Sequence, residues 1–214
     1  MWIAISAAVA CVIIFAFVWE ATRSEELGEG YENYPPPARS LIQREINSLD
    51  WVTQEFLPIN EFSRPGTQIS RINGIVIHFI GNPNTTAIQN RNYFANLAIT
   101  EELYASSNFI ICLDGEIVQC VPVDEIAYAS NQRNADTLSI ELCHPDETGE
   151  FNEETYASAV RLAAWLCNRY GLTKDDIIRH YDVSGKECPR YFVDDEDAWY
   201  EFKSDVASAM LSIA

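Results

Sequence analysis

The sequence predicts an α/β domain with a mixed central β-sheet flanked by helices, preceded by an N-terminal transmembrane helix. The strongest strand signal is GIVIHFI, residues 74–80, a β-branched run bounded by glycines and typical of a strand buried on both faces. Strand-like and helix-like segments alternate through the rest of the chain, which favours a sheet covered by helices. Residues 2–19 instead form one uncharged run that is apolar on every face.

This apolar run, from Trp2 to Trp19, is eighteen residues long. As a helix it would span about 27 Å at ~1.5 Å per residue, which just covers a bilayer hydrocarbon core, and tryptophan at each end suits the interfaces. We therefore expect a membrane anchor over residues 1–22. A cleaved signal peptide is the alternative, but a basic start, a short apolar core and a small-residue cleavage site are not convincing here. A buried soluble helix fits poorly at a terminus.

Residues 23–40 have the composition of a spacer, since SEELGEGYENYPPPARS combines acids, glycines and three consecutive prolines. The folded domain is expected over residues 41–214. Apolar spacing over Leu41–Phe56 predicts that it opens with an amphipathic helix. The next segment, LPINEFSRPGTQISRING, is rich in turn residues.

Further elements follow the strand at residues 74–80. Thr85 or Thr86 can cap a helix that runs to about Ala98. The inward-facing residues of that helix are expected to be Tyr93, Phe94 and Leu97. NFIICLDGEIVQCVP predicts a hairpin turning at Asp114-Gly115.

The last third of the domain repeats the alternation. LSIELCH predicts a strand, and Asn152 caps a long helix that ends before Gly171. DIIRHYD predicts a strand that enters a loop, and residues 194–212 predict a final helix.

Composition excludes two classes of protein. A hydrophobic share of 48% with 12% aromatic residues is ample for a packed core, so disorder throughout is excluded. The formal net charge of -18, with no run of Lys and Arg to offset it, would repel DNA or RNA. No nucleic-acid partner is expected.

The chemistry-bearing residues gather in HYDVSGKECPRYF, where His180 is followed by Lys186 and Cys188. A buried strand histidine such as His78 is, taken alone, more often a core residue bonded to backbone. If the two strands are neighbours, however, His78, His180 and Cys188 form a His-His-Cys set with a fourth position open, the pattern of catalytic zinc. Histidine 144, which precedes a proline turn, is expected to lie in a loop or on the surface.

The cysteines allow two other interpretations, a catalytic dyad and disulfide bonds. Cys188 and His180 could form a nucleophilic dyad instead of a metal site. The cysteines at positions 112, 120, 143 and 167 could form two disulfides in an exported domain, but we expect buried free thiols, because 112 and 120 flank the hairpin turn asymmetrically.

Several motifs, in order, resemble the zinc-dependent N-acetylmuramoyl-L-alanine amidases of the type 2 group, which share a fold with peptidoglycan recognition proteins and the T7-type phage lysozyme. The matching pieces, from about residue 58 to 205, are GIVIHFIGNP, LDGEIVQCVP, SIEL followed by CHPDETGEF, and IIRHYDVSGKECPRYF. The resemblance implies hydrolysis of the amide between N-acetylmuramic acid and L-alanine, in peptidoglycan or a muropeptide.

The resemblance also implies roles for five residues. His78, His180 and Cys188 fall on the Zn²⁺ ligands, Lys186 on the lysine that stabilises the oxyanion, and Glu141 on the acid that in many members takes a proton from the attacking water. Such a protein would be anchored in the membrane with its catalytic domain extracytoplasmic, in the cell envelope, or would be secreted after signal cleavage.

Two stretches depart from the family pattern. Ser107-Asn108 precedes the hairpin where many relatives have tyrosine or histidine, and Tyr128-Ala129-Ser130-Asn131 follows it where relatives often have an aromatic residue and then histidine. A non-catalytic peptidoglycan-binding receptor of the same fold, and a structural membrane protein with incidental histidines, are the competing classes. The presence of Cys188 favours the enzyme.

Overall fold

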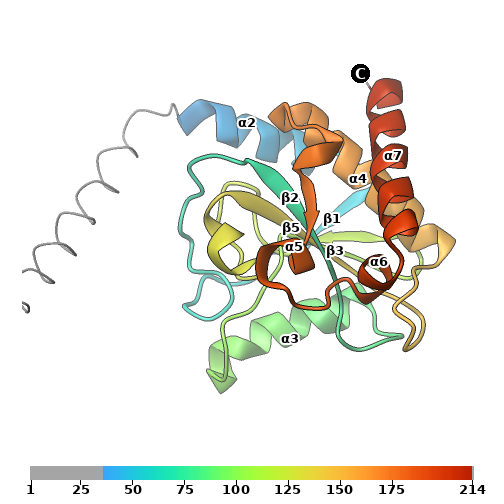
Figure 1. The fold of residues 1–214 in the computed structure, drawn as a ribbon. Coiled ribbons are helices and arrows are strands. Elements are labelled where there is room, and N and C mark those ends of the chain that lie inside the picture. Colours follow the sequence, from blue (N-terminus) through green and yellow to red (C-terminus); the bar gives the residue numbers. More distant parts are fainter. Residues whose placement is uncertain (1–35, 214) are drawn as a thin grey trace, which may run out of the picture. The chain divides into compact units, whose positions relative to one another are not determined.

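The sheet is organised around β2 (Gly74–Phe79), which lies between β5 (Thr137–Leu142) and β6 (Ile177–Arg179) and runs parallel to both. The computed structural model describes residues 36–213. Within them the sheet has six strands in the order β1-β4-β3-β5-β2-β6 (Figure 1). The other three strands are β1 (Val52–Gln54), β3 (Phe109–Ile111) and β4 (Ile117–Gln119).

The sheet is mixed, as the sequence predicts. Hairpin strands β3 and β4 are antiparallel, with Ile111 opposite Ile117 around the Asp114-Gly115 turn, and the other neighbouring pairs of the sheet are parallel. Gly115 has φ +79°, the left-handed conformation that glycine adopts without steric cost.

Helices cover both faces of the sheet. Figure 1 shows α3 on one side, and α4 with α7 on the other. The helices are α2 (Pro36–Asn47), α3 (Ala87–Thr100), α4 (Glu153–Tyr170), α5 (His180–Ser184), α6 (Arg190–Asp194) and α7 (Glu196–Ile213), with 3₁₀ turns η1 (Asn131–Ala135) and η2 (Lys174–Asp176).

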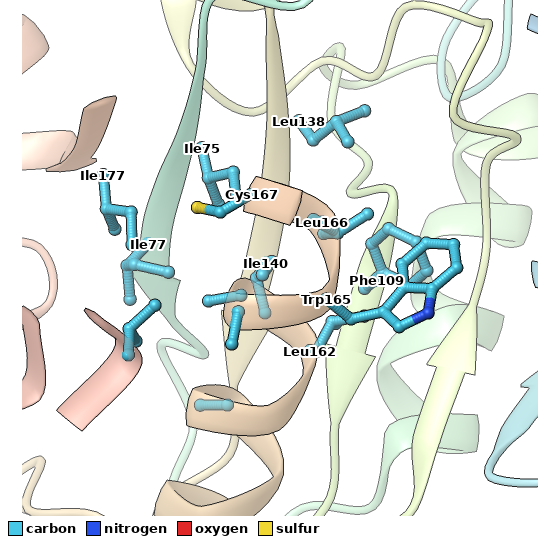
Figure 2. Close-up of a cluster of buried hydrophobic side chains, with 14 of the residues drawn as sticks. Ile75, Ile77, Phe109, Leu138, Ile140, Leu162, Trp165, Leu166, Cys167 and Ile177 are labelled. Carbon is cyan, nitrogen blue, oxygen red and sulfur yellow. The ribbon is translucent and has the colours of Figure 1, made fainter. Parts of the chain in front are cut away.

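Side-chain alternation along the strands divides the interior into two cores. Ile75, Ile77 and Ile140 point towards α4, where they pack with Leu162 and Leu166 (Figure 2). Successive strand residues point to opposite faces of the sheet. His78, which follows Ile77, and Glu141, which follows Ile140, therefore point away from α4.

The second core lies under α3 and is smaller. Phe94 and Leu97 of the helix pack there on Ile110 and Val118 of the hairpin. The face of the sheet that carries His78 and Glu141 is therefore only partly covered by apolar side chains.

The predicted helix caps are confirmed. Thr86 caps α3 in a reciprocal capping box with Gln89, and Asn152 caps α4 by accepting from the Thr155 N–H. Gly171 ends α4 with φ +65°. The expected strand at residues 74–80, the hairpin and the final helix are also present.

Two predictions near the surface are wrong. The helix predicted over Leu41–Phe56 ends at Asn47, and Val52–Gln54 forms strand β1, with Val52 paired to Ile117. Tertiary pairing overrides the local periodicity here, because Val52 gains a strand partner that a helix would not give it. Tyr93, expected to face inward, is 46% exposed.

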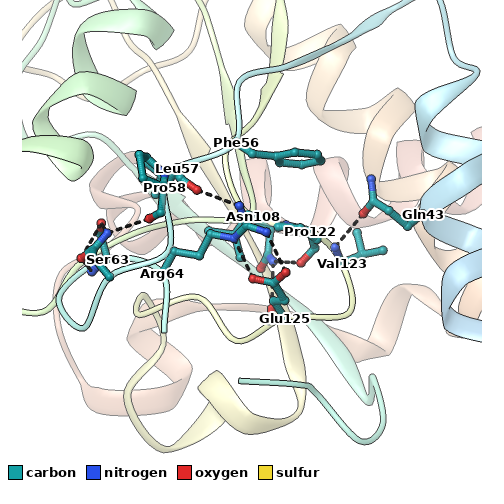
Figure 3. Close-up of polar contacts among 12 residues, drawn as sticks. Gln43, Phe56, Leu57, Pro58, Ser63, Arg64, Asn108, Pro122, Val123 and Glu125 are labelled. Atoms are coloured by element: carbon teal, nitrogen blue, oxygen red, sulfur yellow. Dashed lines mark hydrogen bonds and ion pairs between the residues drawn. The ribbon is translucent and has the colours of Figure 1, made fainter. Parts of the chain in front are cut away.

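A part-buried ion pair holds the turn-rich segment after β1 (Figure 3). The Arg64 guanidinium donates two hydrogen bonds of 2.7 Å to the Glu125 carboxylate and a third to the Leu57 carbonyl. Nearby, the Gln43 side chain of α2 accepts from the Val123 N–H at 2.9 Å. These contacts fasten the N-terminal part of the domain to the segment that follows the hairpin.

The predicted anchor lies outside the described residues, as does most of the predicted spacer, so both stay predictions. Across the described part of the chain, no helix combines the length and the apolar character needed to cross a membrane.

The two glycines that bound the β2 run differ in their surroundings, which yields a stability test. A Cβ on Gly74 would lie 2.7 Å from the Asp176 carbonyl oxygen, whereas a Cβ on Gly81 would meet nothing within 4 Å. We expect Gly74→Ala to lower the free energy of unfolding by about 1–3 kcal/mol and Gly81→Ala to change it by less than about 0.5 kcal/mol. Urea unfolding of the two variants measures this, and equal stabilities would show that the β2–β6 approach is looser than described.

Candidate metal centre

Three parallel strands end at the same edge of the sheet, and their last residues meet there. His78 of β2 is paired in register with Glu141 of β5. On the other side, Ile77 is paired with Arg179, the last residue of β6, so that His180 follows directly beside His78. The carboxyl edge of parallel strands is where α/β proteins usually place their sites.

The strand predicted across residues 176–182 is shorter in the structure. It ends at Arg179, and α5 begins at His180. The Asp182 carboxylate accepts the Arg179 backbone N–H at 2.8 Å and also binds the Arg179 guanidinium, which stabilises the turn into the helix. A loop then returns to this point, because the Tyr181 N–H donates to the Cys188 carbonyl at 2.9 Å. The turn brings Cys188 to the two histidines.

The three predicted ligands form one buried cluster. Their ligand atoms all lie within 4.8 Å of one another, and His78 Nδ1 is 3.9 Å from Cys188 Sγ. His180 Nδ1 is buried without a hydrogen-bond partner. An unpaired buried nitrogen is costly unless something binds it, and two imidazoles with a thiol suit a borderline-soft metal ion. The arrangement fits a metal site.

Burial sets the protonation of the cluster. Desolvation lowers the pKa of His78 well below its usual value, and the charges of His180 and Lys186 lower it further. Desolvation, followed by Lys186, also lowers the pKa of His180. Both rings are therefore neutral at pH 7, as metal binding requires.

Cys188 differs from an activated nucleophile. Burial raises the pKa of its thiol to about 12, whereas a catalytic cysteine needs a lowered pKa. The residue is also only 2% exposed. The Cys188–His180 dyad is therefore disfavoured.

Glu141 and Lys186 lie next to this cluster. The Oε2 atom of Glu141 is buried without a partner, and desolvation raises the pKa of its carboxyl to about 8, against the opposing charge of Lys186. A carboxylate with such a pKa can exchange protons near neutral pH.

Two adjoining hollows open over these residues, with volumes of about 480 and 550 Å³. Both are lined by Phe79, Phe94, Glu141 and Lys186, and the first also by the three clustered ligands. Glu141 and Lys186 therefore lie where the two hollows adjoin. Tyr104 and Tyr128, whose ring centroids are 5.5 Å apart, form one wall of the first hollow.

Histidine 144 lies in the loop after β5, one of the two predicted alternatives, but it is buried and not on the surface. It is 2% exposed, and its ring nitrogens contact the carbonyl oxygens of Asp146 at 2.6 Å and Ile80 at 2.7 Å. These contacts tie the loop after β5 to the end of β2. The His144 ring therefore stabilises the edge of the sheet where the His78, His180 and Cys188 cluster lies.

Ser107 and Asn108, where the sequence departs from the family pattern, have a structural role: their side chains form hydrogen bonds within the sheet region. The Ser107 hydroxyl donates to backbone carbonyls of Phe109 and Ser139, and Asn108 Oδ1 accepts the Ser139 N–H at 3.0 Å. Both side chains are buried and line neither hollow described above.

The expected free thiols are confirmed, since the cysteines at positions 112, 120, 143, 167 and 188 are all buried and form no disulfides.

Two residues at the cluster, Ser130 and Asn131, were not predicted from the sequence. Ser130 and Asn131 contact the outer nitrogens of His78 and His180 respectively. The departure from the family pattern at Tyr128–Asn131 was the only signal in the sequence, and it gave no indication of these contacts.

Comparison with known proteins gives a consistent result. Residues 68–191 match the family model described as N-acetylmuramoyl-L-alanine amidase. The chain is 34% identical over 171 residues to a probable N-acetylmuramoyl-L-alanine amidase of Bacillus licheniformis, covering 74% of this chain and 48% of that protein. It is 31% identical over 179 residues to the N-acetylmuramoyl-L-alanine amidase BlyA of Bacillus subtilis, covering 74% and 47%. The chain thus spans about half the length of these relatives.

Solved structures agree on the fold. The catalytic domain of XlyA superposes with a TM-score of 0.61 at 24% identity, covering 72% of this chain and 98% of that one. PlyL superposes with a TM-score of 0.63 at 21% identity, covering 74% and 98%. The family match extends over more than half of the chain and includes the whole edge of the sheet described above, so the chain belongs to the N-acetylmuramoyl-L-alanine amidase family.

Proposed function

We propose that the chain is a zinc hydrolase that cleaves the amide between N-acetylmuramic acid and L-alanine in peptidoglycan. The observation that carries this proposal is the buried cluster of His78, His180 and Cys188 beside Glu141 and Lys186, in a chain of this family. The named activity of the relatives supports the same reaction.

The ligand set favours Zn²⁺ over other common ions. Two imidazoles and one thiolate leave a fourth tetrahedral position open, which is the pattern of catalytic rather than structural zinc. When bound, zinc would polarise the scissile carbonyl and make water at the open position more acidic.

Glu141 is proposed as the proton carrier. Its Oε2 atom would accept a proton as water attacks the carbonyl carbon, and would return that proton to the amide nitrogen as the C–N bond breaks. The products are a free lactyl carboxylate on the sugar and a free amino group on L-alanine, and Glu141 ends as it began. Because Oε2 has no partner in the described part of the chain, no hydrogen bond has to be broken first.

Lys186 is proposed to stabilise negative charge on the carbonyl oxygen. After desolvation, which is the larger cause, its charge contributes to the lowered pKa of both histidines, and this supports a role near the cluster. A fixed cation near a developing oxyanion, in a site partly shielded from water, stabilises the transition state more than the ground state.

The two hollows suit a substrate with two arms. The scissile amide joins a glycan to a peptide, and Glu141 and Lys186 line both hollows at their junction. An amide placed at this junction would leave one hollow for each arm.

Digestion of purified peptidoglycan tests the bond that is cut. We expect new amino termini on L-alanine and no new reducing sugar ends, because the proposed reaction cleaves the amide and not the glycosidic bond. End-group analysis of the digest measures both. New reducing ends without new L-alanine termini would identify a glycosidase, and binding without any new end would identify a receptor.

Variants separate proton transfer and charge stabilisation from metal binding. Glu141→Gln and Lys186→Ala should each lower kcat by about 100-fold or more while zinc content stays near one per chain, because neither residue is a proposed ligand. Cys188→Ser should lose zinc, because a neutral hydroxyl replaces the thiolate. The assay is kcat together with elemental analysis.

The control is Lys174→Ala, which removes an exposed lysine at the opposite end of β6 and should leave kcat and zinc unchanged. Full activity in zinc-loaded Glu141→Gln would place the base elsewhere. Loss of zinc in that variant would make Glu141 a ligand instead.

A further inference from the structure

The two histidines of the cluster present the same nitrogen to its centre. His78 Nδ1 faces Cys188 Sγ at 3.9 Å, and His180 Nδ1 is buried without a partner. The outer nitrogens are bonded instead to neighbouring side chains: His78 Nε2 lies 3.1 Å from Ser130 Oγ, and His180 Nε2 lies 2.7 Å from Asn131 Oδ1.

These outer contacts decide which nitrogen can bind a metal. An amide oxygen only accepts, so the bond to Asn131 requires the proton of His180 on Nε2 and leaves the Nδ1 lone pair free. The Ser130 hydroxyl can accept from or donate to His78 Nε2, so it engages the outer nitrogen of that ring in either tautomer. A neutral imidazole with its proton on Nδ1 could not bind a metal through that atom, and at His180 a switch to that tautomer would cost the hydrogen bond to Asn131.

The segment that carries both residues is itself held rigidly. Asn131 has φ +52°, a left-handed conformation that asparagine tolerates better than most residues. Asn134 Oδ1 accepts the N–H groups of both Ala129 and Ser130. Gln132 Nε2 donates to the Val183 carbonyl of α5, the helix that begins with His180.

Such a conformation persists only where the surrounding contacts determine it, and it is often found at functional sites. The hydrogen bond from Gln132 fixes the segment relative to α5, and hence Ser130 and Asn131 relative to His180.

We propose that Asn131 is a positioning residue which holds His180 in the Nε2–H tautomer, and that Ser130 orients the His78 ring, so that both Nδ1 atoms are aimed at one metal ion. The inference rests on the metal site of the proposed function, but not on the substrate or on the reaction. Loss of such an outer hydrogen bond typically weakens metal binding by about 10–100-fold.

The tautomers can be measured directly because the chain has only three histidines. In the metal-free full-length protein labelled with ¹⁵N-histidine, long-range ¹H–¹⁵N spectra should show protonated Nε2 at His180. Asn131→Gly should remove this preference, and Ser130→Ala should leave it unchanged. Protonated Nδ1 at His180 in the unsubstituted protein would overturn the inference.

Zinc affinity provides the second readout, by competition with a chelator of known affinity. Asn131→Gly should weaken zinc binding by about 10–100-fold, because glycine removes the acceptor yet accepts the left-handed backbone. Asn131→Asp should restore most of the affinity, since a carboxylate oxygen accepts the same N–H bond.

The matched control is Asn84→Gly, the same change at an exposed asparagine with φ +55°, which should leave zinc affinity unchanged. Equal affinities for Asn131→Gly and Asn84→Gly would overturn the positioning role. Absence of zinc binding in the unsubstituted protein would instead refute the metal site of the proposed function, so the two failures are distinguishable.

Discussion

The site depends on the parallel register of β2 between β5 and β6. This pairing places His78 beside Glu141 and brings His180 to the next position at the same edge. Side chains alternate with a period of two, so a slip of β2 by one residue would turn His78 towards α4 and put an apolar neighbour in its place beside Glu141. The interdigitated isoleucines on the α4 face oppose such a slip, because it would carry them out of the larger core. Packing on one face of the sheet therefore fixes chemistry on the other.

That chemistry requires polar groups where the fold would otherwise bury apolar ones. Most of them are compensated: the histidines by Ser130 and Asn131, and the polar pair before the hairpin by the backbone around Ser139. Two atoms are left unpaired in the described part of the chain, Glu141 Oε2 and His180 Nδ1. Both lie at the edge where β2, β5 and β6 end. Unsatisfied buried groups destabilise a fold, and their concentration at one place is expected where a ligand completes them.

Much of this could be predicted from sequence because the signals are local. Strand β2, the caps Thr86 and Asn152, and the hairpin turn each depend on a few adjacent residues. The errors arise where distant partners decide. Val52 fits a helical period but pairs with Ile117, and His144 follows a strand yet is buried by contacts with Ile80 and Asp146. Ser130 and Asn131 were missed for the same reason, since nothing in a short window shows that they reach two histidines some fifty residues away on either side.

The central claim is that strand register and the η1 segment together build a zinc site bound through Nδ1 of both histidines. Diffraction from crystals of the zinc-loaded protein, recorded on both sides of the zinc absorption edge, tests it most directly. We predict one anomalous peak about 2.0–2.1 Å from Nδ1 of His78 and of His180, and about 2.3 Å from Cys188 Sγ. A peak bonded through Nε2 of either ring, or one away from Cys188, would contradict it.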